Sequence, residues 1–211
     1  MTGVATFSAE VEEYDVESLR DCVGGPEWEV QPERVAVLVH DMQPYYLNVL
    51  AQSVCTRVAA EVSKVVSRAR ALGIPILASG PRTASAIEQR GLLGPMWGLG
   101  PSAEEGAITE PDFVPIAKRS YSAFYATDLE VELRRRGRDQ LIIVGVFASA
   151  GVLATTFDAF ARDIQCFVGI ESIADYTAHQ HRTAMNLIAS LTGTVTSSGN
   201  LLHDRHGGPL D

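Results

Sequence analysis

Runs of branched apolar residues alternate along this chain with segments of helical periodicity, and this alternation restricts the fold more than any other feature. The runs RVAVLVHD at 34–41 and QLIIVGV at 140–146 are almost continuously apolar. Strands buried on both faces, as in a parallel sheet, have this character. Shorter runs predict further strands at 74–79, 113–118, 165–170 and 193–198.

Helices are predicted between these strands, at 54–73, 127–137, 149–163 and 178–192. In the first helix, Val54, Val58 and Val62 recur at helical spacing, and Gly73 suits its end. The second opens with Thr127 three residues ahead of Glu130, which is the spacing of a capping box. In the third helix, one face is expected to carry Val152, Thr155 or Thr156, Ala159 and Phe160.

Strands and helices in alternation predict an α/β fold, a doubly wound and mainly parallel Rossmann-like sheet flanked by helices. Pro115 favours an edge position for the strand at 113–118. The Gly- and Pro-rich segment 80–112 shows no sustained period, and so long a connection is usually functional or conceals an element.

A chain of 211 residues can form one domain with a single large core. Neither an internal repeat nor an interdomain linker is found in the sequence. We therefore expect one domain at 30–200, an N-terminal extension at 1–29 that packs on it, and a C-terminal tail at 201–211.

Composition disfavours several partners. A net charge of −9 argues against nucleic acid, and the basic run at 134–138 suits a solvated helix end. No apolar run reaches the roughly 18 residues that a membrane span needs. The acidic N-terminus lacks the pattern of a secretory signal, and three cysteines fit a reduced, cytoplasmic setting.

Metals and cofactors are not expected. His179 and His181 lie two residues apart, and His203 and His206 lie three apart near the end of the chain. Ligands on one helix face need a spacing of three or four, and no group of Cys, Asp or Glu completes a set. No dinucleotide or P-loop motif follows the first strand.

Three strand ends carry groups suited to chemistry. Asp41 follows the first strand, Lys118 closes the third, and the turn at 145–151 leads from the fourth strand into a helix. In open α/β sheets the ligand crevice lies beyond these carboxyl ends, so the three should converge. On position alone, Asp41 could instead be a helix N-cap and Lys118 a solvent-facing lysine.

Five segments occur in the order and at roughly the spacing of the isochorismatase-like hydrolases. They are VLVHDMQPYYL, QRGLLGPMWGLG, KRSYSAF, QLIIVGVFASAGVLATTFDAFARDIQCFV and SIADYTAHQH. Over about residues 30–200 the chain resembles this family, and more narrowly the isochorismatase branch of siderophore and phenazine biosynthesis. The resemblance implies an α/β hydrolase for a small chorismate-derived acid, and a homodimer or higher homo-oligomer.

Many members of this superfamily are amidases with a catalytic Asp, Lys and Cys. The resemblance assigns the first two roles to Asp41 and Lys118 and places Gly151 where the nucleophilic Cys would stand. A thiolate nucleophile is then lacking, because the cysteines lie elsewhere, at Cys22, Cys55 and Cys166. The isochorismatase branch also lacks this Cys and hydrolyses an enol-pyruvyl (vinyl) ether.

Vinyl ether cleavage requires one acid, so Asp41 is expected to protonate the terminal methylene carbon of isochorismate or an aminodeoxy analogue. This requires a pKa above the usual value of about 3.9 for Asp, which burial could produce. A nearby Lys118 would act in the opposite direction. Either Lys118 mainly grips a substrate carboxylate or hydroxyl, or the substrate's own charge compensates.

Arg90 resembles the family's clamp for a substrate carboxylate. An apolar wall is expected from aromatic residues that are also plausible core residues, namely Tyr46, Trp97, Tyr121, Phe124 and Phe147.

The chain departs from the family pattern at several of these positions. Pro81 replaces a substrate-binding Gln, and the adjacent Arg82 could supply a different contact. Arg119-Ser120 replaces a Trp-Arg pair, and Phe147 stands where Tyr is frequent. These changes indicate an altered substrate or weakened activity. A diverged amide or ester hydrolase of another natural-product intermediate, with Asp41 as base, and a non-catalytic binding protein on the same fold remain alternatives.

Overall fold

A six-stranded sheet forms the centre of the computed structural model, which describes residues 10–202. Every pair of neighbouring strands is parallel, and the order is β3-β2-β1-β4-β5-β6. The predicted α/β class and parallel sheet are therefore confirmed. The strands are β1 (Val35–His40), β2 (Ile76–Pro81), β3 (Val114–Lys118), β4 (Gln140–Val146), β5 (Gln165–Ala174) and β6 (Gly193–Thr196).

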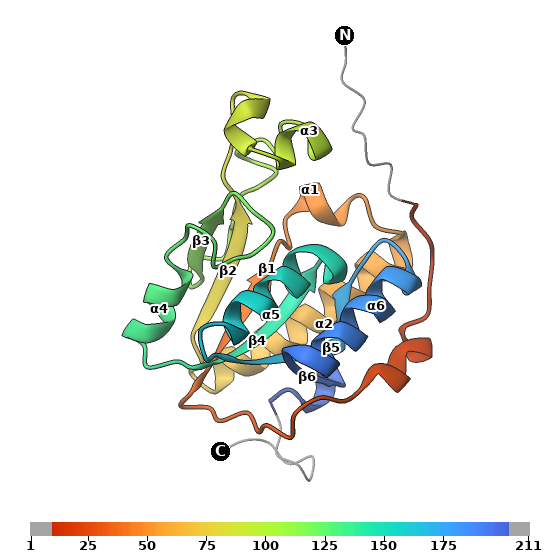
Figure 1. Ribbon diagram of the computed structural model, residues 1–211, viewed down its shortest axis with the longest axis vertical. Coiled ribbons are helices and arrows are strands. Elements are labelled where there is room, and N and C mark those ends of the chain that lie inside the picture. The colour runs from red at the N-terminus through yellow and green to blue at the C-terminus, as the bar shows by residue number, and fades with distance from the viewer. Residues whose placement is uncertain (1–9, 203–211) are drawn as a thin grey trace.

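Helices cover both faces of the sheet, with α5 and α6 in front of it and α2 behind it in Figure 1. The α-helices are α1 (Pro44–Leu47), α2 (Gln52–Ala71), α3 (Leu93–Trp97), α4 (Leu129–Arg135), α5 (Leu153–Phe160) and α6 (Ala178–Leu191). Short 3₁₀ helices are η1 (Val16–Cys22), η2 (Ile87–Arg90) and η4 (Ser198–Asn200), and η3 (Ala148–Val152) is a π-helical turn.

Two apolar cores lie on the two faces of the sheet, because successive side chains of a strand point to opposite faces. From β1, Val35 and Val37 enter the core under α2, whereas Ala36 and Leu38 enter the core under α4, α5 and α6. All six residues of β1 are buried. Burial on both faces explains why the sequence of β1 does not alternate between apolar and polar residues.

The strand predictions are confirmed in number and sequence, with small differences in their bounds. The strand β3 is at the sheet edge, as Pro115 indicated. The unpatterned segment 80–112 conceals η2 and α3, two short helices too brief to show a period.

Two local predictions on helices are wrong. The cap of α4 is Asp128, and Thr127 makes no capping box because its hydroxyl donates to the carbonyl of Ala123 and accepts from the amide of Leu129. Phe160 does not share the buried face of α5, since it is 54% exposed at the end of that helix.

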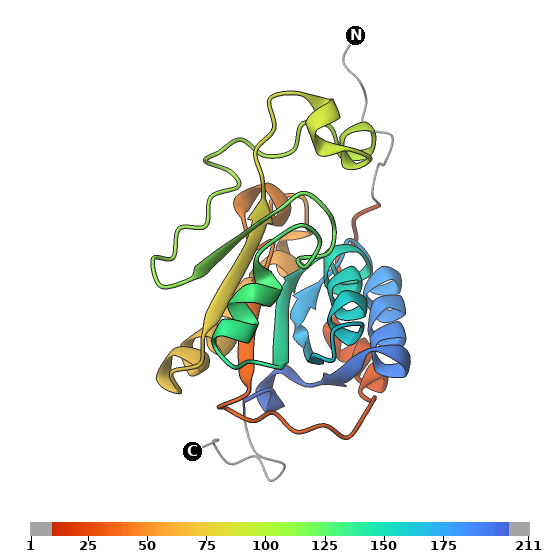
Figure 2. The same cartoon turned by 60° about the vertical axis from the view of Figure 1, so that its left-hand side comes forward.

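The strand order reverses between β1 and β4, and this reversal positions the site. The connection after β1 leads to β2 on one side, and the connection after β4 leads to β5 on the other side. This divergence opens a crevice at the carboxyl ends of β1 and β4. Figure 2 shows the sheet from another side, with α3 and the long segment around it above these ends. Asp41 and the turn at 147–151 follow these two strands directly.

The two ends of the described chain pack differently. The segment before β1 contains η1, whose Leu19 is fully buried in the core beneath α6. At the other end, Leu201 and Leu202 are buried in the core beneath α2. The remaining part of the expected tail, with His203 and His206, lies outside the described residues. Within residues 10–202, no helix combines the length and apolarity that crossing a bilayer requires.

Candidate active site

A buried ion pair lies at the mouth of the crevice. The Nζ of Lys118 is 2.7 Å from Oδ2 of Asp41, and the two residues are only 6% and 5% exposed. Lys118 also donates to the carbonyl of Ser120 at 3.0 Å. Two N–H groups of its ammonium are thereby engaged within the described chain, so a third is left for a bound molecule.

The backbone and its neighbours fix the orientation of Asp41. Its φ of 51° lies in the left-handed region, which few residues other than glycine adopt without cost. Ser79, at the end of β2, donates from Oγ to Oδ1 of Asp41 at 3.1 Å. Gln43 in turn donates to the carbonyl of Ser79 at 2.9 Å. Residues of β2 and β3 therefore hold the carboxylate of Asp41, which lies directly after the end of β1.

The turn after β4 forms the opposite side of the crevice. Ser149, in η3, donates its amide to Oδ2 of Asp175 at 2.6 Å, and Tyr176 donates its amide to Oδ1 of the same carboxylate. The ring of Phe147 stacks on that of Tyr176, with centroids 4.3 Å apart. Burial raises the pKa of Asp175 above its usual range, and the amide of Ser149 partly offsets this effect.

A cavity of about 330 Å³ opens above the ion pair. Of the predicted site residues, it brings together Asp41, Tyr46, Arg90, Trp97, Lys118, Tyr121, Phe147 and Gly151. Burial raises the pKa of the Tyr46 phenol, so this ring stays uncharged at the cavity wall. The volume suits a ligand with a single small ring.

The segment between β2 and β3 supplies one wall. Trp97 donates from its indole N–H to the hydroxyl of Tyr121 at 2.8 Å. Arg90 donates from Nη1 to the carbonyl of Gly98 at 2.7 Å, and its guanidinium lies directly over Gly100. The φ of 75° at Gly100 explains a glycine there, because side chains rarely adopt this left-handed backbone conformation.

Two predicted residues lie elsewhere. Phe124 is not brought to the cavity, because its ring is buried in the core beneath α4 and α5 with the guanidinium of Arg162 5.1 Å from its centroid. Arg82 lines a smaller adjoining cavity of about 30 Å³, together with Pro81, Gln89 and Arg119. Arg90 and Lys118 border both cavities, so the smaller one is a cationic annex of the larger.

Sequence reasoning missed several residues of the site. Tyr45, Val49, Leu93 and Tyr176 line the cavity, and Val11 reaches it from the N-terminal segment. Tyr176 follows the end of β5, so the rule that ligands bind beyond strand ends could have identified it. Nothing in the local pattern points to Val11, because it lies far from the other residues in sequence.

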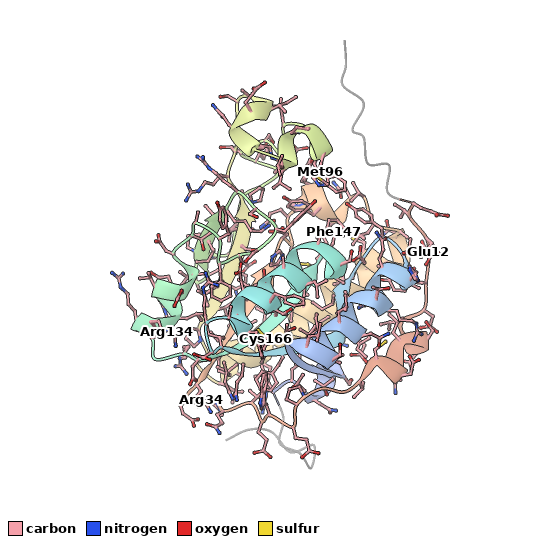
Figure 3. All side chains as sticks on the ribbon, in the orientation of Figure 1. Glu12, Arg34, Met96, Arg134, Phe147 and Cys166 are labelled. Carbon is pink, nitrogen blue, oxygen red and sulfur yellow. The ribbon has the colours of Figure 1, made fainter. Side chains whose placement is uncertain are left out.

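None of the three cysteines, all of which the structure describes, lines this cavity. Figure 3 shows Phe147 at the upper end of the sheet and Cys166 toward the lower end. Burial raises the pKa of the Cys166 thiol. Among residues 10–202, no group of three or more His, Cys, Asp or Glu is placed to hold a metal ion.

The arrangement offers a carboxyl group for proton transfer and two cations for an anionic ligand. Aromatic rings surround both, which favours a flat and largely apolar body between charged ends. Asp41 and Lys118 both line the cavity, and none of the three cysteines, which all lie within the described chain, does.

Comparison with known proteins gives a consistent result. The isochorismatase domain family matches residues 35–199. A protein named as a probable isochorismatase from Pseudomonas chlororaphis is 35% identical, over 96% of this chain and all of its own length. Phenazine biosynthesis protein PhzD1 of Pseudomonas aeruginosa is 36% identical, over 83% of this chain and 88% of its own.

A crystal structure of a cysteine hydrolase from Pseudomonas syringae pv. phaseolicola has the same fold, with a TM-score of 0.71 and 22% identity. The alignment covers 82% of this chain and 92% of that one.

Proposed function

Because the chain belongs to the isochorismatase family and is a hydrolase of that family, we propose that it cleaves the enol-pyruvyl ether of isochorismate or an aminodeoxy analogue. The observation that carries this proposal is a buried Asp41–Lys118 pair facing an aromatic cavity with glycine at position 151. A reaction that needs an acid and no enzyme nucleophile matches these groups.

The proposed reaction begins when Asp41 transfers a proton to the terminal methylene carbon of the vinyl ether. The resulting oxocarbenium ion adds water at the former vinyl carbon. The hemiketal then collapses. The bond between its central carbon and the ether oxygen breaks, the proton of its hydroxyl passes to that oxygen, and pyruvate and a dihydroaromatic alcohol leave. The proton lost by the added water restores the acid, so the cycle balances without a cofactor.

The ion pair sets a condition on this mechanism. The first step needs a protonated carboxyl at Asp41, and Oδ2 of this residue lies 2.7 Å from the ammonium of Lys118. We propose that a carboxylate of the substrate competes for Lys118 and that Asp41 takes up a proton as the complex forms. The third N–H of Lys118 and the adjoining Arg90 support such a contact.

The cationic annex supports an acidic substrate. Arg82, Arg90 and Arg119 border it with Lys118, and no acidic side chain of residues 10–202 lines it. A guanidinium binds a carboxylate through two parallel hydrogen bonds. We propose that Arg90 binds a ring carboxylate and that Arg82 compensates for the glutamine contact that Pro81 cannot make.

Release of pyruvate from isochorismate, and in parallel from its aminodeoxy analogue, tests the proposal directly. Wild-type protein should release pyruvate, and Asp41→Asn should slow this release about 10²–10⁴-fold, the range typical of a lost general acid. Asp163→Asn is a matched control, because this exposed residue lies at the end of α5, away from the cavity, and Asn tolerates its φ of 57°. Unchanged pyruvate release in Asp41→Asn would refute the assignment.

An amide or ester hydrolase is the competing candidate, and the 2.7 Å contact between Lys118 and Asp41 supports Asp41 as a base. Ammonia release from an amide panel, in the absence of pyruvate from either vinyl ether, would favour this candidate. If neither reaction occurs while a chorismate-derived acid raises the melting temperature, the protein acts as a binding module.

A further inference from the structure

The residue beneath the active site that the mechanism does not use is His40, the last residue of β1. Its side chain is fully buried and does not line the cavity. Its Nδ1 lies 2.8 Å from the carbonyl of Val146, and because a carbonyl only accepts, this nitrogen carries the hydrogen. Its Nε2 faces the hydroxyl of Thr155 at 3.4 Å.

The imidazole is a neutral group in a fixed position. Burial lowers the pKa of His40, since the charged form would lose its hydration, and the nearby Lys118 acts in the same direction. Asp41 opposes this shift from 3.6 Å. With its tautomer set by Val146 and no path to solvent, the ring is suited to filling space rather than to proton transfer.

The space that it fills is that of a side chain at position 151. A Cβ built on Gly151 would lie 2.2 Å from Cε1 of His40 and 2.9 Å from its Nε2. Contacts this short do not occur between real side chains, and the ring cannot retreat because the carbonyl of Val146 holds its Nδ1 and Thr155 lies beside Nε2. The backbone of His40 also leaves no room for a side chain at position 145, since a Cβ on Gly145 would lie 2.1 Å from the His40 carbonyl oxygen.

From this contact we infer that His40 determines the class of reaction that the pocket can perform. Its ring occupies the volume into which any side chain at position 151 would project, so this position is restricted to glycine and the pocket to chemistry without an enzyme nucleophile. The role extends the reaction proposed above. It is tested by stability and alkylation rather than by turnover, so either proposal can fail without the other.

A double-mutant cycle between His40→Val and Gly151→Ala tests the coupling. Gly151→Ala alone should lower the melting temperature by about 4–8 °C through overpacking, although alanine normally favours a helix. In the double variant the combined loss should be smaller than the sum of the single losses by at least about 4 °C. Gly24→Ala is the control, since a Cβ at Gly24 would meet nothing within 4 Å.

A second measurement uses Gly151→Cys in the His40→Val background and iodoacetamide as the probe. The sulfur of Cys at position 151 should attack the methylene carbon of the reagent, forming an S–C bond as iodide leaves and the thiol proton passes to solvent. Peptide mass mapping should show alkylation at position 151 at least about 10-fold faster than at the native cysteines, which are buried or half-buried.

Three results would overturn the inference. The first is a Gly151→Ala variant with His40 intact that melts within about 1 °C of the wild-type protein. The second is strict additivity in the cycle, which would show that the two positions do not share the same volume. Wild-type-like stability and rapid alkylation of Gly151→Cys without any change at His40 would have the same consequence.

Discussion

At the scale of single residues, the site depends on a few side chains that are each held from two sides. Arg90 illustrates this, because one of its nitrogens is bound to Gly98 while the guanidinium packs over Gly100 at the cavity. Such fixation reduces the entropy that the side chain loses when it binds a carboxylate. It also fixes the plane in which a bidentate contact can form.

We therefore predict that Arg90→Lys raises KM for isochorismate about 10-fold and changes kcat less than about 3-fold, because it removes ground-state binding. Initial-rate measurements of pyruvate release give both constants. Arg135→Lys, at an exposed position of α4, is the control. A fall in kcat with an unchanged KM would instead show that Arg90 interacts with the substrate mainly in the transition state.

At the scale of elements, the turn that joins β4 to α5 depends on a residue of another strand. Asp175 follows β5, and its carboxylate accepts the amide of Ser149 within η3. The carboxylate of Asp175 also accepts the amide of Tyr176, whose ring stacks on that of Phe147 at the cavity. One carboxylate thus connects two loops that line the site.

Asp175→Asn should lower the free energy of unfolding by about 1–3 kcal/mol, because an amide cannot accept both backbone hydrogens and one is left unpaired. Displacement of the turn should also lower kcat/KM by about 10-fold. Urea unfolding and initial rates measure the two effects. A variant that loses neither would show that the π-helical turn holds its shape without Asp175.

At the scale of the whole molecule, the N-terminal segment closes over the carboxyl ends of the strands. Figure 3 shows Glu12 at the end of the sheet beside α6. Its amide donates to the carbonyl of Tyr176, and the hydroxyl of Tyr14 contacts Nδ1 of His181 at 3.0 Å. Val11, next to Glu12, and Tyr176 both line the cavity, so the N-terminal segment and the loop after β5 meet at one side of the site.

The buried His181 makes the stability of this arrangement depend on pH. Burial lowers the pKa of His181 to about 3, from 6.5 in its unperturbed state. The unfolded chain therefore binds more protons between these values, and stability is lost as the pH falls below about 6.5. Between pH 7.5 and 5.5 the loss from this residue should be about 1.4 kcal/mol.

We expect His181→Gln to lose that part of the pH dependence, as measured by urea unfolding at pH 7.5 and 5.5. His179→Gln, on the exposed side of the same helix, should retain the full decrease. His40 contributes in the same direction and remains in both variants, so the stability of His181→Gln should still decrease somewhat as the pH falls. An unchanged slope in His181→Gln would contradict the prediction.

Local patterns in the sequence were sufficient to identify the strands and the longer helices, and the family resemblance supplied most of the candidate site residues. Burial of β1 and β4 on both faces makes their runs continuously apolar, and the spacing of Val54, Val58 and Val62 marks α2. Asp41 and Lys118 were predicted as site residues because they lie at strand ends, and Gly151 because it lies in a family motif that can be recognised in the sequence. These features depend on neighbouring residues, which is why no tertiary information was needed.

Contacts across the sheet could be decided only by the tertiary structure. The 2.7 Å approach of Lys118 to Asp41, the displacement of Phe124 into the core and the contact of His40 with the space at Gly151 all depend on strand order and register. The wall formed by Val11 depends on how the N-terminal segment packs. Such contacts join residues far apart in sequence, and their geometry is determined by the packing of the whole domain rather than by any local preference.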